Sequence, residues 1–121
     1  MSSRPEELRE RTKKFALRII RLFRSLPFRT DTQVLGKQLL RCGTSVAANY
    51  RAACRARSKA EFIARIGIVA EEADEAVLWL ELLTESGVVA EEKASELLGE
   101  AKELAAIFTA SQQTSKKRSK L

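Results

Sequence analysis

A segment in the middle of the chain combines closely spaced arginines with small residues. Residues 41–62 read RCGTSVAANYRAACRARSKAEF and hold four arginines and one lysine but a single acid. Guanidinium groups bind phosphate and carboxylate oxygens in a planar, two-pronged geometry, and at helical spacing they line up on one face of a helix. The chemistry that this segment favours is recognition of a polyanion.

The residue types that catalysis needs are sparse. The chain has no histidine, which removes the commonest general base near neutral pH and the commonest zinc ligand. Cys42 and Cys54, the only cysteines, would lie about 18 Å apart on one helix, too far for a disulfide, and two thiols alone make no zinc site. Ser45 has no evident base beside it. We therefore expect reduced thiols, no metal, no cofactor and no enzymatic activity.

The net charge of +6 hides a sharp division along the chain. Residues 1–65 carry sixteen Lys and Arg against five acids, whereas residues 66–115 carry two against eleven. Residues 116–121 add four more cations. Like charges on one helix face repel one another, and a polyanion such as RNA or DNA relieves that repulsion. The expected nucleic-acid-binding residues are Lys14, Arg18, Arg21, Lys37, Arg41, Arg51 and Arg55.

Three other interpretations of the basic residues stay open. A charged helix face is often only solvated, and the acids of the second half could neutralise the first half within the fold. A basic face could also dock an acidic protein partner without touching nucleic acid. Finally, the segment KKFALRIIRLFRSL separates basic from apolar residues, as helices that lie on membrane surfaces do. Because no zinc finger or aromatic RNA-binding strand is present, binding to nucleic acid should depend on the phosphate backbone and on salt.

The elements that must position these cations are helices. A chain of 121 residues with only five glycines and two prolines is typical of a single all-α domain. Apolar positions that step by threes and fours predict helices over about 5–26, 31–55, 59–86 and 90–110. Short connections between long helices favour an antiparallel up-down-up-down four-helix bundle spanning residues 1–110. The polar, basic segment SQQTSKKRSKL, residues 111–121, is expected to be a disordered tail.

Several residues have expected structural roles in this bundle. Ser58 and Glu61 have the spacing of a capping box, which begins the third helix. Asn49 lies in the apolar seam of the second helix and needs a polar partner. Two glycines inside that helix, Gly36 and Gly43, suggest close helix approach or a local irregularity. A second apolar stripe on the third helix is expected to form an oligomer interface or to cover the end of the core: Ile68, Trp79 and Leu82.

The sequence also bears on where the protein works. No apolar run approaches the ~20 residues of a membrane-spanning helix, and the first residues, MSSRPEELRERTKK, lack the apolar core of a signal peptide. We expect a cytoplasmic protein.

Nearly the whole chain, from residues 27–83 outward, resembles the bacterial four-helix-bundle proteins that include those encoded in intervening sequences of 23S ribosomal RNA genes. A related branch is the accessory variability determinant of diversity-generating retroelements. The residues that carry this resemblance are Arg41, Ser45, Asn49, Arg57, Ser58, Glu61 and Phe62.

The resemblance implies a small basic bundle that assembles into a homopentameric barrel. It also implies nucleic acid as a partner and, for the retroelement branch, a reverse transcriptase. Many members read Asn-Ile-Ala-Glu-Gly where this chain has Asn49 followed by Tyr, Arg and two alanines, so the asparagine is shared and the acid and glycine are not.

Overall fold

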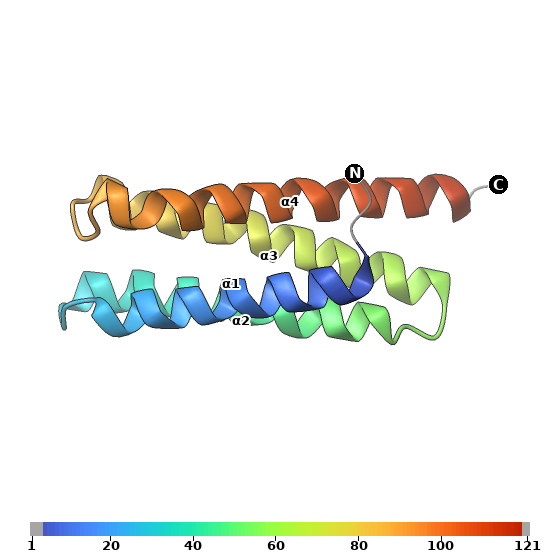
Figure 1. Ribbon diagram of the computed structural model, residues 1–121, viewed down its shortest axis with the longest axis horizontal. Coiled ribbons are helices and arrows are strands. Elements are labelled where there is room, and N and C mark those ends of the chain that lie inside the picture. The colour runs from blue at the N-terminus through green and yellow to red at the C-terminus, as the bar shows by residue number, and fades with distance from the viewer. Residues whose placement is uncertain (1–3, 120–121) are drawn as a thin grey trace.

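A computed structural model describes residues 4–119 as four long helices joined by short loops (Figure 1). The helices are α1 (Pro5–Ser25), α2 (Thr30–Cys54), α3 (Lys59–Glu85) and α4 (Glu91–Ser119), and the described residues contain no strand. Each helix runs antiparallel to the one before it, which confirms the predicted all-α class and four-helix bundle. The first three helices have the predicted bounds to within a residue.

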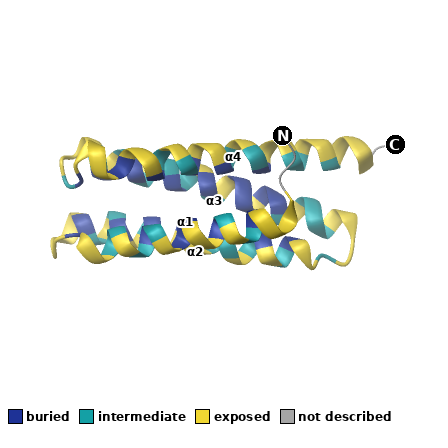
Figure 2. Ribbon diagram, viewed as in Figure 1, coloured by how far each residue is buried: buried dark blue, intermediate teal, exposed yellow. Residues whose placement is uncertain are grey.

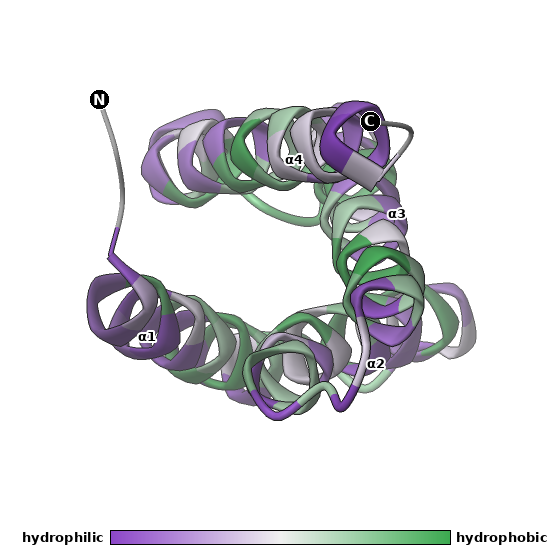
Figure 3. Ribbon diagram, turned by 90° about the vertical axis from the view of Figure 1, so that its right-hand side faces the viewer, coloured by the Kyte–Doolittle hydropathy of each residue, from purple (hydrophilic) through white to green (hydrophobic). Residues whose placement is uncertain are grey.

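The helices are arranged in chain order around the core. Seen along the bundle, α1, α2, α3 and α4 follow one another around a common interior (Figure 3). Buried positions form one stripe along each helix, as the periodic apolar positions predict (Figure 2). Successive helices pack along their lengths, whereas α1 and α4 approach each other much less closely. The bundle is therefore tightly packed at three seams and more open at the fourth.

Local signals in the sequence explain the helix ends. Pro5 occupies the first turn of α1, where its missing N–H costs nothing. Ser58 is the N-cap of α3, and its hydroxyl oxygen accepts a hydrogen bond from the backbone N–H of Glu61 at 3.0 Å. Gly87, with a φ of 85°, takes the left-handed conformation that ends α3. These signals fix where the chain reverses direction.

The two glycines of α2 mark close approach to α1 rather than a break in the helix. A Cβ atom at Gly36 would lie 2.7 Å from Leu26 Cδ1 and 3.0 Å from Phe23 Cδ1. A Cβ atom at Gly43 would overlap the end of the Ile19 side chain. The absence of side chains here lets α1 pack directly against the α2 backbone, which fixes the position of the two basic helices relative to each other.

The expected disordered tail is wrong for the residues that the structure describes. Helix α4 continues to Ser119, nine residues beyond the predicted end at 110. Gln112 lies over Gly67 of α3, where no side chain is in the way, and its amide nitrogen donates a hydrogen bond to the Ile63 carbonyl at 3.3 Å. Three cations, Lys116 to Arg118, suit the negative end of a helix dipole. Residues 120 and 121 lie outside the described part of the chain.

None of the helices described over residues 4–119 has a segment long and apolar enough to cross a lipid bilayer. The apolar face of KKFALRIIRLFRSL, which a membrane-surface helix would need, is packed inside the bundle at Phe15 and Ile19.

Candidate nucleic-acid interface

The outer face of α2 carries the basic stripe of the central segment. The buried positions of α2 face α1 and α3, so the remaining positions, spaced by threes and fours, form a single outward stripe. The members of this stripe are all exposed, namely Val34, Lys37, Arg41, Thr44, Ala48, Arg51 and Arg55. The small side chains between the cations leave the guanidinium and ammonium groups accessible, which is the arrangement a phosphate backbone needs.

Arg41 differs from the rest of the stripe because it already binds two carboxylates. Its guanidinium contacts Glu72 at 2.8 Å and Glu75 at 2.5 Å, both on α3, and approaches the Cys42 sulfur at 3.3 Å. Trp79 completes this cluster by donating a hydrogen bond from Nε1 to the Glu75 carboxylate at 3.2 Å. Arg41 therefore links α2 to α3. For this residue, the charge is neutralised by acids of the second half of the chain, which is one of the alternatives that the sequence left open.

The same cluster contains the one set of side chains in residues 4–119 whose spacing could hold a metal ion. The ligand atoms of Cys42, Glu72 and Glu75 lie within 4.8 Å of one another. Burial raises the pKa of the Cys42 thiol to about 12, so it stays protonated near neutral pH. The Arg41 guanidinium already contacts all three groups. Their proximity is therefore better explained by binding of the arginine than by binding of a metal ion.

The cations of α1 divide in the same way. Arg18 lies 3.7 Å from Glu96 on α4. Arg21 lies in a shallow hollow between α1 and α4 that Arg18, Glu92 and Glu96 also line. Lys14 is exposed, and neither it nor Arg21 forms an ion pair within the described residues. Of the seven expected binding residues, two are paired with acids of α3 and α4, and five remain available.

Arg11, also on α1, is held by two carboxylates of α4. Its Nε and Nη2 atoms donate to the two carboxylate oxygens of Glu100 at 2.7 Å each, and Nη2 also contacts Glu103 at 2.8 Å. The hydrogen bond to Glu100 raises the pKa of the Arg11 guanidinium above its ordinary value. This side chain joins α1 to α4 and is not free to bind a ligand.

The expected structural residues have polar partners. The Asn49 amide nitrogen donates to the Ser45 carbonyl at 3.1 Å and to its hydroxyl at 2.8 Å, and the Asn49 oxygen accepts from Arg65 Nη1 at 3.2 Å. In the cap of α3, the Glu61 carboxylate accepts from the backbone N–H of Arg57 at 2.7 Å, rather than from that of Ser58 as in the standard capping box. Asn49 thus cross-links α2 to α3, and Glu61 also binds the preceding loop.

The expected oligomer-interface residues lie on α3, outside the core. Ile68 and Leu82 are each 40% exposed, while Trp79 is half-buried and held by Glu75. Among the exposed apolar residues that were not predicted from the sequence are Leu78, which is 47% exposed, and Val34 on α2, which is 57% exposed. Both could have been found as apolar residues at positions that the helical period places outside the core.

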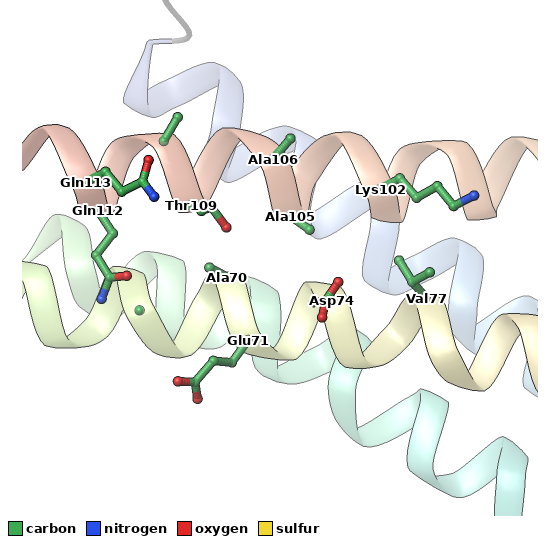
Figure 4. A pocket seen from close by; sticks show the side chains of 12 residues that line it. Ala70, Glu71, Asp74, Val77, Lys102, Ala105, Ala106, Thr109, Gln112 and Gln113 are labelled. Atoms are coloured by element: carbon green, nitrogen blue, oxygen red, sulfur yellow. The ribbon is translucent and has the colours of Figure 1, made fainter.

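A different surface, between α3 and α4, is a shallow groove with a floor of small residues. Gly67, Ala70 and Ala105 contribute to this floor, and Glu71 and Asp74 of α3 lie at its side (Figure 4). Lys102 is the one cation among the lining residues, so the two carboxylates leave the groove net negative, which repels phosphate. Nucleic acid is therefore not expected on this side of the bundle.

Comparison with known proteins identifies a family but no activity. A family model described as "23S rRNA-intervening sequence protein" matches residues 6–110. A solved structure from Bacteroides thetaiotaomicron, described as a protein of unknown function from the S23 ribosomal protein family, is 31% identical. The match covers 90% of this chain and 97% of that one, with a TM-score of 0.82. No curated protein matches the sequence. Because neither match names a retroelement protein, the link to a reverse transcriptase stays a prediction.

Proposed function

The chain belongs to the family of 23S rRNA-intervening sequence proteins, and from this premise we propose that it is a non-enzymatic, homo-oligomeric helical bundle that binds RNA or DNA through the phosphate backbone. The observation that carries the proposal is the set of exposed cations on α1 and α2 that pair with no acid in residues 4–119. These residues are Lys14, Arg21, Lys37, Arg51 and Arg55.

The physical basis of the proposed binding is the geometry of the α2 stripe. Arg51 in the last turn of α2 and Arg55, the C-cap residue, are four residues apart, so at about 1.5 Å per residue they lie about 6 Å apart along the helix axis and present two cations on the same side. Exposed cations of this kind neutralise phosphates and release counterions, so they give affinity without reading base edges. Binding should therefore fall steeply with salt and depend little on sequence.

Assembly is the second part of the proposal. Ile68, Leu78 and Leu82 on α3, together with Val34 on α2, leave apolar side chains exposed outside the core of a single subunit. Burying such residues against a second copy removes apolar surface from water. We propose that five copies assemble into a closed ring, a homopentamer. Sedimentation velocity should then show one species with the mass of five subunits. A monomer at all concentrations would contradict this part of the proposal and leave binding to be tested alone.

The experiment that tests binding compares two charge-reversal variants with the wild-type protein. Arg51→Glu/Arg55→Glu alters the exposed α2 stripe, and Lys93→Glu/Lys102→Glu makes the same change in net charge on α4. Fluorescence anisotropy with a labelled RNA and a labelled DNA duplex measures affinity as salt is raised. The α2 variant should bind at least tenfold more weakly and with a shallower salt dependence, because two fewer phosphates are neutralised. Absence of wild-type binding even at low salt would overturn the proposal.

The pairing of Arg41 with Glu72 and Glu75 supports one alternative function, because one cation of this face already binds carboxylates of the same chain. In this alternative the α2 stripe docks an acidic protein, and a reverse transcriptase is the partner that the resemblance implies. A protein partner should bind with a defined stoichiometry. A nucleic acid, by contrast, should be bound at any position along its own strand, so the number of bound proteins should rise with its length. Isothermal titration with the purified polymerase, in the absence of nucleic acid, distinguishes the two.

A further inference from the structure

Cations from three distant parts of the sequence meet at one end of the bundle. Because successive helices are antiparallel, the beginning of α1, the α2–α3 loop and the end of α4 all lie at the same end (Figure 1). This basic end carries Arg9 from α1, Arg57 from the α2–α3 loop, Lys59 from the first turn of α3, and the run Lys116 to Arg118 from α4. None of these side chains forms an ion pair with an acid in the part of the chain that the structure describes.

Helix formation in residues 111–119 is what brings the last of these cations into place. The Gln112 contact with α3 holds the end of α4 beside the beginning of α3. As a result, Arg118 and Lys59, which are 59 positions apart in the sequence, line the same groove. A disordered tail would not fix the distance between these two charges.

The groove between them has an apolar floor and a polar rim. Leu8, half-buried Phe62 and half-buried Ile107 form the floor, and Ser111 and Thr114 add hydroxyl groups beside Lys59 and Arg118. Its volume is about 880 Å³. A second hollow of about 450 Å³ shares Leu8, Phe62 and Ser111 with it and extends to Arg9. The combination of an aromatic side chain, hydroxyl groups and cations suits a ligand that is flat and apolar on one part and anionic on another.

We propose that this groove holds an unstacked nucleotide of a single-stranded nucleic acid, with the base against Phe62 and its phosphate bound by Lys59 and Arg118. The inference rests on the proposed function and adds a second contact, at the end of the bundle, to the outward stripe of α2. A paired base in a duplex cannot enter such a groove, whereas a base in a single strand can be turned out and placed on an aromatic ring. The groove therefore predicts a preference for single strands, which the α2 stripe alone does not.

Charge reversal at the rim tests the binding of phosphate. Lys59→Glu/Arg118→Glu makes the same change in net charge as Lys93→Glu/Lys102→Glu, which lies away from this groove. A glutamate at residue 59 is favourable in the first turn of α3, whereas a glutamate at residue 118 opposes the dipole of α4, so circular dichroism should show that the variant keeps the helix content of the wild-type protein. With a short single-stranded RNA of mixed sequence, the rim variant should bind at least tenfold more weakly than the control. The slope of log affinity against log salt should fall by about 1.4, or about 0.7 for each phosphate that is no longer neutralised.

Phe62→Leu tests the base contact, because leucine keeps an apolar side chain in the floor but removes the aromatic ring. The variant should bind the same RNA about tenfold more weakly. Its affinity for inorganic polyphosphate, which has no bases, should be unchanged. Thermal unfolding of both proteins shows that the fold is kept.

The outcomes separate this inference from the proposed function. If the rim variant and Phe62→Leu bind single strands as the control does, while Arg51→Glu/Arg55→Glu loses binding, the groove is wrong and the α2 stripe stands. Equal affinity of the wild-type protein for single strands and duplexes would also count against the groove. If the wild-type protein binds neither form at low salt, the proposed function itself fails.

Discussion

Helix α1 is held by two different kinds of contact on its two sides. Towards α2, its side chains lie directly on a helix backbone at Gly36 and Gly43, with Ile19 against the second of these positions. Towards α4, the closest links are ion pairs, in which Arg11 binds Glu100 and Glu103 and Arg18 approaches Glu96.

The two sides should respond to different perturbations. Close apolar packing depends on shape, so the α1–α2 seam should be sensitive to added side-chain volume and insensitive to salt. Partly exposed ion pairs depend on charge and are screened, so the α1–α4 seam should weaken as ionic strength rises. The basic helices α1 and α2 are thus a rigid pair, and α4 is the more easily separated neighbour of α1.

The largest effect is expected where a side chain is added between α1 and α2. Gly43→Leu would place a branched side chain where even a Cβ atom overlaps Ile19. We expect a loss of about 3 kcal/mol in the free energy of unfolding, measured by urea denaturation at a fixed protein concentration.

Gly99 of α4 offers the matched control for this change. A Cβ atom there meets no other group within 4 Å, and leucine is a better helix former than glycine. Gly99→Leu should therefore leave stability unchanged or raise it slightly. Equal losses in the two variants would show that added volume between α1 and α2 is not what matters.

Removing the strongest ion pair should have a smaller effect. Arg11→Met keeps the aliphatic part of the side chain but leaves Glu100, whose side chain is only 16% exposed, without its two hydrogen bonds. We expect a loss of about 1–2 kcal/mol in the free energy of unfolding, between the values for surface and buried pairs. Lys14→Met, at an exposed position of the same helix, is the control.

A double-mutant cycle with Glu100→Gln isolates the pair itself. The coupling between Arg11 and Glu100 should be favourable at low salt and decrease as salt is added. A coupling that does not depend on salt would contradict the view that this seam is held by charge.

Most of the fold could be predicted from the sequence because it depends on local signals. The period of the apolar residues identifies each helix. Local chemistry then fixes helix ends at Pro5, at the cap residue Ser58 and at the turn residue Gly87. The end of α4 could not be predicted in this way. Its last turns are polar on their own, and they are held by the Gln112 contact with α3, which no local pattern reveals.

The candidate site could be predicted only in part. Helical spacing identifies the outward face of α2, because exposure there follows from the period of a single helix. Whether a given cation is paired depends on the neighbouring helix, so Arg41 and Lys37 look alike in the sequence although only Arg41 meets two carboxylates. The basic end needs still more information, since Lys59 and Arg118 come together only through the topology of the whole bundle.

The smallest effect is expected at the outermost ion pair of the α1–α4 seam. Arg18 and Glu96 are 3.7 Å apart, and the Glu96 side chain is 92% exposed, so water and salt screen their attraction. Arg18→Met should change the free energy of unfolding by less than about 0.5 kcal/mol, and the change should vanish at high salt. Urea denaturation of Arg18→Met and Arg11→Met compares how much each ion pair of the α1–α4 seam contributes to the free energy of unfolding. If Arg18→Met cost as much as Arg11→Met, the exposed pair would be as important as the half-buried one, and the seam would have to be treated as one cooperative network rather than as a single anchor at Arg11.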